Sequence, residues 1–204
     1  MLLSRDRRFI FIHIQKTGGV AMEKALESVA PDAVQYFNDL AACRDPLKNR
    51  HLFAADLKAY LGDDEWRRYF KFAFVRNPWS RLVSWYNMCV ERPSNAFMWY
   101  VKVNTRTFDD FLNLTDGPAA KTVFNQVDYI SDEQGHLLVD FVGRFETIAT
   151  DFVQVCERLD VNVSLQRLNT GSPVDYRTYY DERTRQVVAN RFRRDIETFG
   201  YQFD

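Results

Sequence analysis

A hydrophobic segment that runs directly into a Lys-Thr-Gly-Gly turn constrains the fold of this chain more than any other feature. Residues Arg7–Gly19 read R-R-F-I-F-I-H-I-Q-K-T-G-G, and the pattern V-A-M-E-K-A-L-E-S-V follows at once. The two patterns predict a strand over Arg8–Ile14 and a helix over Gly19–Val29. When a strand, a glycine turn and a helix follow one another in this way, the backbone N–H groups of the turn and the N-terminus of the helix point toward the same site. Such an arrangement is typical of a site that binds phosphate or another anion.

A second candidate anion site follows in Phe70–Tyr86, which read F-K-F-A-F-V-R-N-P-W-S-R-L-V-S-W-Y. We expect a buried strand over Lys71–Val75, with an arginine directly after it. Asn77 is suited to cap the next helix, with Pro78 at its first position. Two anion sites on one small sheet imply a ligand that carries two separate phosphate-like groups.

The rest of the chain alternates between strand and helix patterns, which indicates an α/β fold with a mostly parallel sheet covered on both faces. A C′ glycine, Gly200, should end the last helix. The further elements that we expect are a short strand Ala33–Tyr36, helices Leu52–Leu61, Asp63–Tyr69 and Thr107–Leu114, a strand Leu137–Phe145, and helices Thr147–Leu159 and Asp181–Phe199.

Length and charge exclude several classes of protein. The 204 residues suit a single domain over 1–204, and a net charge of −1 argues against a non-specific nucleic-acid binder. No apolar run is long enough to span a bilayer, and we expect a cytoplasmic, bacterial protein. Cys43, Cys89 and Cys156 lack the spacing of metal ligands, so we expect reduced thiols and no metal site. The oligomeric state stays open.

Four segments occur in an order that resembles one known family. They are H-I-Q-K-T-G-G, F-V-R-N-P-W-S-R-L-V-S-W-Y, D-F-V-G-R-F-E at Asp140–Glu146, and Y-Y-D-E with D-I-E-T-F-G-Y-Q-F near the end. Together they closely resemble the sulfotransferase superfamily and, within it, the carbohydrate-type branch called sulfotransferase family 2. The resemblance covers nearly the whole chain. It implies the P-loop-NTPase-like sulfotransferase fold, with a central, mostly parallel sheet flanked by helices.

The resemblance also implies the donor 3′-phosphoadenosine 5′-phosphosulfate (PAPS) and the residues that bind it. On this pattern Arg76 and Ser84 hold the 3′-phosphate. The 5′-phosphosulfate is held by Lys16, Thr17, Gly18 and Gly19, with Val20 and Ala21 next in the same loop. The family usually has Thr-Ser at these last two positions, so two hydroxyl donors are absent here. Gln15 replaces the usual proline.

Transfer to an alcohol needs alignment, a base and a cation near the leaving phosphate. Lys16 is the candidate cation, because its ammonium can follow charge that develops on the bridging oxygen. Of the three histidines, we expect His13 to be a core residue and His136 to lie in a solvated turn. His51 matches the position of the base in family members. Carboxylates are the alternative, either Glu23 or Asp56.

The only sequence evidence on the acceptor is the amino-acid composition of the region where we expect it to bind. Aromatic and cationic residues between 76 and 106 suit a saccharide or glycolipid hydroxyl. The candidate acceptor residues are Trp85, Tyr86, Arg92, Gln126 and Tyr129. The Asn169–Pro173 loop is a candidate lid over the adenosine end of the donor.

Two other functions remain open on the sequence. The first is a nucleotide or small-molecule kinase, but the G-x-x-x-x-G-K-[ST] loop is missing, because Lys16 precedes Gly18 and Gly19. Arg76 also occupies the position where a kinase needs a carboxylate side chain to bind magnesium. The second is a non-catalytic module that binds the 3′,5′-bisphosphate, which the Val20–Ala21 departure favours. We expect the enzyme, with PAPS as donor and no metal.

Overall fold

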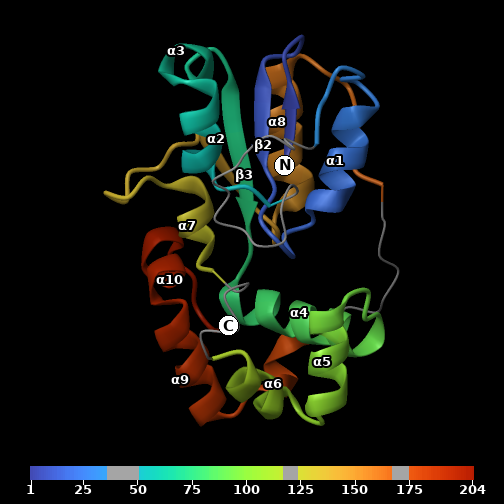
Figure 1. Ribbon diagram of the computed structural model, residues 1–204, viewed down its shortest axis with the longest axis vertical. Helices are drawn as coiled ribbons and strands as arrows, with labels where there is room; N and C mark the ends of the chain where they lie inside the picture. Colours follow the sequence, from blue (N-terminus) through green and yellow to red (C-terminus); the bar gives the residue numbers. More distant parts are fainter. Residues whose placement is uncertain (36–50, 117–123, 167–174) are drawn as a thin grey trace. The chain divides into compact units, whose positions relative to one another are not determined.

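The computed structural model describes residues 1–35, 51–116, 124–166 and 175–204. They form two compact units (Figure 1). The first contains Met1–Arg76 and the segment from Gln126, and the second contains Asn77–Asn125 and the end of the chain. We describe each unit by itself, and the single domain over 1–204 stays a prediction.

The first unit contains the parallel sheet. Among the described residues the strand order is β1-β2-β3-β4, where β1 is Leu2–Ser4, β2 is Phe9–Ile12, β3 is Phe70–Val75 and β4 is Phe141–Arg144. The pairs β2–β3 and β3–β4 are parallel, whereas β1 is antiparallel to β2. The carboxyl ends of β2, β3 and β4 therefore meet at one edge of the sheet. This confirms the mostly parallel α/β sheet, although β1 was not predicted.

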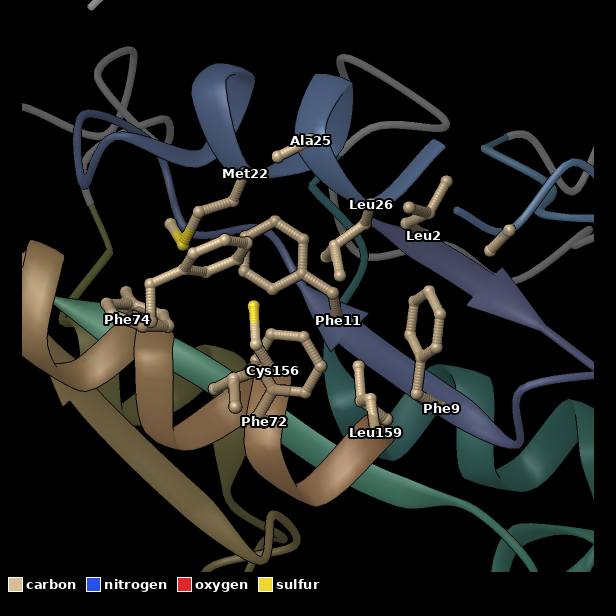
Figure 2. Packing of buried hydrophobic residues seen from close by; sticks show 13 residues of the cluster. Leu2, Phe9, Phe11, Met22, Ala25, Leu26, Phe72, Phe74, Cys156 and Leu159 are labelled. Atoms are coloured by element: carbon tan, nitrogen blue, oxygen red, sulfur yellow. The ribbon is translucent and has the colours of Figure 1, made fainter. Parts of the chain in front are cut away.

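One face of this sheet is covered by α1 (Gly19–Glu27) and α8 (Ile148–Leu159), whose buried residues pack with those of β2 and β3 (Figure 2). The period of two along a strand places Phe9 and Phe11 on the same side. The rings of Phe11 and Phe72 stack with their centroids 5.2 Å apart, between the two helices (Figure 2). The alternate residues, such as Ile10, are equally buried. Strands buried on both faces explain the nearly continuous hydrophobic runs of the sequence.

In its described residues, the first unit also contains three shorter helices. They are α2 (Ala54–Leu61), α3 (Asp63–Trp66) and α7 (Gln126–Ile130). The positions of α2 and α3 confirm the two short helices expected there, but α7 was not predicted. The strand expected over Ala33–Tyr36 is reduced, in the described residues, to one antiparallel bridge between Val34 and Leu3. The strand expected over Leu137–Phe145 begins only at Phe141.

The second unit is helical in its described residues. It contains α4 (Pro78–Glu91), α5 (Ala96–Asn104), α6 (Phe108–Leu114), the 3₁₀ turn η2 (Tyr176–Tyr179), α9 (Glu182–Arg191) and α10 (Arg193–Phe199). Asn77 caps α4 as expected, since its Oδ1 accepts from the N–H groups of Trp79 and Ser80. The helix α5 and the turn η2 were not predicted.

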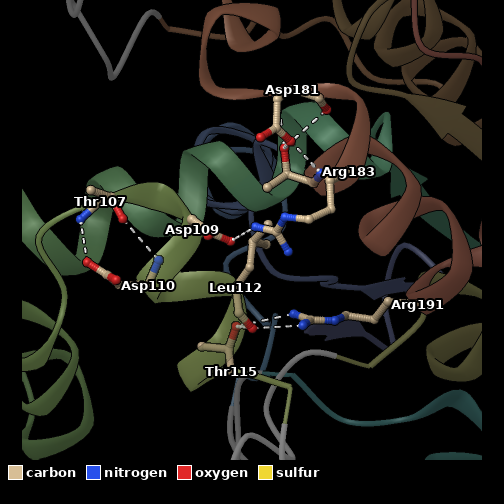
Figure 3. Close-up of polar contacts among 9 residues, drawn as sticks. Thr107, Asp109, Asp110, Leu112, Thr115, Asp181, Arg183 and Arg191 are labelled. Atoms are coloured by element: carbon tan, nitrogen blue, oxygen red, sulfur yellow. Dashed lines mark hydrogen bonds and ion pairs between the residues drawn. The ribbon is translucent and has the colours of Figure 1, made fainter.

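Side-chain caps and arginine contacts hold the second unit together (Figure 3). Thr107 and Asp110 form a reciprocal capping box at the start of α6. Arg183 pairs with Asp109, and Arg191 donates to the carbonyl oxygen of Leu112 at 2.8 Å. Both arginines lie on α9, so these contacts join the end of the chain to α6.

The single helix expected over Asp181–Phe199 is wrong, because it is broken at Phe192 into α9 and α10. Phe192 has ψ 28°, outside the helical range, and its side chain is only 1 % exposed. The break therefore coincides with a buried aromatic residue that a helix pattern alone does not reveal. Gly200 ends α10 in the left-handed region with φ 65°, as expected. Among the described residues, no helix combines the length and apolarity needed to cross a membrane.

Candidate functional site

The turn between β2 and α1 is held in a conformation that few sequences can adopt. Gly18 caps α1 with φ 84°, in the left-handed region that favours glycine, and Lys16 has φ 68°. Thr17 is fully buried, and its hydroxyl donates to the carbonyl oxygen of Ile14 at 2.9 Å. Within the described residues, α1 has no side-chain capping hydrogen bond at Gly18. The first N–H groups of a helix have no partner within the helix, so this N-terminus is suited to an anion.

Gly19 allows the turn to approach His13 closely. A Cβ atom at residue 19 would lie 2.1 Å from Cδ2 of His13 and 2.2 Å from its Nε2. At Gly18, a Cβ atom would lie 2.6 Å from the side chain of Ile148. A side chain at either position would clash with these neighbours, so the packing requires both glycines. The same packing fixes the backbone of the turn.

His13 is a core residue, as predicted. Its ring is 3 % exposed, and its Nδ1 lies 2.8 Å from Oε1 of Glu23. The same carboxylate oxygen accepts from the amino group of Met1 at 3.0 Å. Glu23 is fully buried and contacts both the ring of His13 and the amino group of Met1, whereas Asp56, the other candidate carboxylate, is half-buried on α2.

His51 lies beside His13 and is held by its backbone. The Nδ1 of His51 is 2.8 Å from the carbonyl oxygen of His13, and the two rings meet edge to face at 4.6 Å. A carbonyl oxygen only accepts, so Nδ1 carries the hydrogen and Nε2 keeps its lone pair. Burial, and then the nearby charge of His13, lower the pKa of His51 to about 3. The imidazole is thus neutral at neutral pH.

Arg76 brings the second predicted anion site to the glycine turn. It follows β3 directly, at the sheet edge where β2 also ends. Its guanidinium lies 4.1 Å above the ring of Phe145, and its Nη1 donates to the carbonyl oxygen of Lys16 at 3.3 Å. The guanidinium of Arg76 therefore contacts the backbone of Lys16, which is 60 residues earlier in the sequence, within the first unit.

The other donor and acceptor candidates are distributed over both units. Ser84 is half-buried on α4, about two turns from its start. Trp85 is 4 % exposed, whereas Arg92 is exposed at the end of the helix. Tyr86 packs on Phe108 with the ring centroids 5.5 Å apart, and burial raises the pKa of its hydroxyl.

Gln126 and Tyr129 are fully buried on α7. The amide of Gln126 is bonded to the backbone of Arg76, and the ring of Tyr129 stacks on Phe53 at 4.6 Å. Their role as acceptor contacts stays a prediction. The candidate lid Asn169–Pro173 lies outside the described residues.

The sequence patterns assigned no role to Phe145, and they gave Gln126 only as a candidate acceptor residue, not as a partner of Arg76. Phe145 follows the carboxyl end of β4, so its place in the D-F-V-G-R-F-E motif was a usable signal. Nothing in the sequence indicated that the side-chain amide of Gln126 would bond to the backbone of Arg76. His136 is exposed in a turn, as expected, with its Nδ1 3.2 Å from Asp132.

Within the described part of the chain, His, Cys, Asp and Glu side chains form no group of three that could hold a metal ion. Cys89 and Cys156 are buried, and Cys43 lies outside the described residues.

Comparison with known proteins agrees with this geometry. A sequence model described as the sulfotransferase family matches residues 1–202. The crystal structure of a mouse sulfotransferase complexed with PAP superposes with a TM-score of 0.58 at 16 % sequence identity. The alignment covers 95 % of this chain and 86 % of the mouse chain, and at this identity the likeness concerns the fold. Curated proteins gave no match.

Proposed function

This chain belongs to the sulfotransferase family, and from that premise we propose that it transfers a sulfonate group from PAPS to a hydroxyl group of a carbohydrate or glycolipid. The observation that carries the proposal is the contact between Arg76 and the carbonyl oxygen of Lys16. It brings the guanidinium of Arg76 to the glycine turn that leads into α1. A donor with anionic groups at both its 3′ and 5′ positions needs two such cations.

The residues of the glycine turn fit this donor. The packing of Gly18 and Gly19 leaves no room for a Cβ and so fixes the backbone that leads into the N-terminus of α1, where N–H groups suit an anion. Lys16, Thr17, Gly18 and Gly19 would hold the 5′-phosphosulfate, with Val20 and Ala21 next in the first turn of α1. Arg76 and Ser84 would hold the 3′-phosphate. When bound, the donor supplies the sulfonate group and a phosphate leaving group.

His51 is the base that we propose for the transfer. Its Nδ1 hydrogen is committed to the His13 carbonyl, so Nε2 is the atom that accepts the proton of the acceptor hydroxyl. Lys16 neutralises the charge that collects on the leaving phosphate oxygen. A pKa of about 3 keeps the imidazole unprotonated but makes it a weak base. The negative charge of a bound donor raises that pKa toward neutrality.

The acceptor proposal draws on the exposed aromatic residues of α5. Trp99 and Tyr100 are each 53 % exposed, and the ammonium of Lys102 lies 5.4 Å above the ring of Trp99. Aromatic faces with a cation beside them suit a sugar ring that carries negative charge. Labelled donor offered with a panel of sugar, lipid and phenolic alcohols tests this choice. Transfer to phenols alone would contradict it.

Thermal unfolding with adenosine 3′,5′-bisphosphate, compared with ATP plus magnesium, tests the donor. Stabilisation by the bisphosphate alone supports the proposal, because a ligand of the native state stabilises by mass action. Equal stabilisation by ATP favours the kinase instead. Lys16→Ala and Arg76→Ala should each remove most of the shift. Lys24→Ala and Arg68→Ala change exposed residues of the same charge and should keep it.

A non-catalytic bisphosphate-binding module is the second candidate, favoured by the missing hydroxyls at Val20 and Ala21. The variant His51→Ala separates it from the enzyme. For the enzyme, this variant keeps the bisphosphate shift and loses transfer. A wild-type protein that binds the bisphosphate and transfers sulfonate to no alcohol would support the module.

A further inference from the structure

The side-chain amide of Gln126 is bonded at both ends to the backbone of one other residue, Arg76. Oε1 of Gln126 accepts from the N–H group of Arg76 at 2.8 Å, and its Nε2 donates to the carbonyl oxygen of Arg76 at 2.8 Å. Gln126 is 0 % exposed, so both bonds are shielded from water. Hydrogen bonds in such an environment are strong, and leaving either partner unsatisfied is costly.

These bonds continue the sheet beyond the point where β3 ends. The parallel pairing of β3 with β4 stops at Val75 and Arg144, and the carbonyl oxygen of Val75 then accepts from the N–H group of Phe145 at 2.7 Å. One residue later, Gln126 exchanges both a donor and an acceptor with Arg76. A neighbouring residue of an antiparallel strand exchanges the same two bonds. The amide therefore takes the place of a strand partner at Arg76.

The fixed backbone determines where the guanidinium of Arg76 lies. From this position the side chain stacks on Phe145 at 4.1 Å and reaches the carbonyl oxygen of Lys16 at 3.3 Å. If the backbone of Arg76 rotated, the guanidinium would move away from the glycine turn, because a long side chain amplifies a small change at its Cα. A cation that must meet one phosphate gains affinity when it is held in place before binding.

We infer that Gln126 is a positioning residue for Arg76: its buried amide fixes the strand end so that the guanidinium recognises the 3′-phosphate of the donor. The inference rests on the proposed function. It gives Gln126 a role through Arg76 and requires no contact between Gln126 and the ligand.

Equilibrium binding of two nucleotides tests this inference. Adenosine 3′,5′-bisphosphate carries the 3′-phosphate, and adenosine 5′-monophosphate lacks it. Gln126→Met has about the same length and no amide. We expect it to weaken bisphosphate binding about tenfold, which corresponds to the loss of one or two buried hydrogen bonds. Binding of the monophosphate should be unchanged. A merely structural role would weaken both nucleotides alike.

Matched variants complete the test. Gln134→Met alters an exposed glutamine of the same unit and should bind both nucleotides like the wild type. In an Arg76→Ala background, Gln126→Met should have no further effect on the bisphosphate, since the residue that it positions is gone. If Gln126→Met does not fold, Gln126→Glu keeps the acceptor and loses the donor, and it is compared with Gln134→Glu.

Two failures can be told apart. If the wild type does not prefer the bisphosphate over the monophosphate, the proposed donor site is wrong and the inference fails with it. If the wild type shows the preference and Arg76→Ala loses it, but Gln126→Met retains it, only the inference is overturned.

Discussion

The Nδ1 hydrogen of His51 is donated to the main-chain carbonyl oxygen of His13, 2.8 Å away. The tautomer of the candidate base is therefore set by the strand end that leads into the glycine turn. His13 in turn lies against Gly19 and pairs with Glu23 on α1. The candidate base, the glycine turn and α1 are thus connected through one buried histidine.

Acid should destabilise the protein through His51. Its pKa is lowered from 6.5 to about 3 in the folded state. Between these values the unfolded chain binds a proton that the folded chain does not. The free energy of unfolding therefore falls as the pH falls, by at most about 1.4 kcal/mol per pH unit from this group. The contribution is fully present above the unfolded pKa.

Urea unfolding of the wild type and His51→Asn, at about pH 7.5 and about pH 5, measures this effect. The asparagine amide can still donate to the His13 carbonyl but does not titrate in this range. The wild type should lose more free energy of unfolding than the variant on acidification. Parallel losses would show that His51 is not buried in its neutral form.

Gly19→Ala should destabilise the fold, although alanine normally favours a helix by about 1 kcal/mol over glycine. The new Cβ would lie 2.1 Å from the buried ring of His13, so the ring or the turn must move. We expect a loss of about 1–3 kcal/mol and weaker bisphosphate binding. Gly135→Ala is the control. A Cβ at residue 135 meets no atom within 4 Å, so this variant carries only the cost of alanine at a φ of 85° and no clash. An unaltered or higher melting temperature for Gly19→Ala would contradict the close packing.

The double variant Val20→Thr, Ala21→Ser should strengthen binding of adenosine 3′,5′-bisphosphate. Val20 is 42 % exposed in the first turn of α1, so a hydroxyl group can replace one methyl group there. A new hydrogen bond to a charged phosphate corresponds to about a tenfold gain in affinity. Calorimetry should show the gain, and Val103→Thr on α5 provides a control at an exposed valine. Unchanged affinity would mean that these positions do not face the donor.

Removing the cap of α6 should cost more than removing a similar threonine elsewhere. The side chain of Thr107 accepts from the N–H group of Asp110 at 3.1 Å, so Thr107→Ala should lose about 1 kcal/mol of stability. Thr147 stands at the N-cap of α8 but makes no capping bond there, and Thr147→Ala should lose less. Denaturant unfolding compares the two. Equal losses would refute the cap as a source of stability.

Transfer should continue in excess EDTA. The sulfonate group carries one negative charge, less than a phosphoryl group, and Lys16 and Arg76 supply positive charge at the glycine turn. Initial rates with EDTA and with added magnesium should agree. A rate that vanishes on chelation and returns with magnesium would favour the kinase alternative.

The sequence by itself determined the strand, turn and helix around Lys16, because apolar periodicity and glycine preferences are local properties. It also determined the cap at Asn77 and the mostly parallel sheet. It did not reveal β1, since three buried residues are too short for a pattern, or the break at Phe192, where burial opposes a continuous helix.

Only the tertiary structure decided which residues meet. Three contacts join residues that are distant in the sequence. Arg76 and Lys16 are 60 residues apart, Gln126 and Arg76 are 50 apart, and His51 and His13 are 38 apart. Such contacts depend on strand register and on where each chain segment returns to the sheet edge. No local pattern encodes that information, and the tautomer of His51 follows from it.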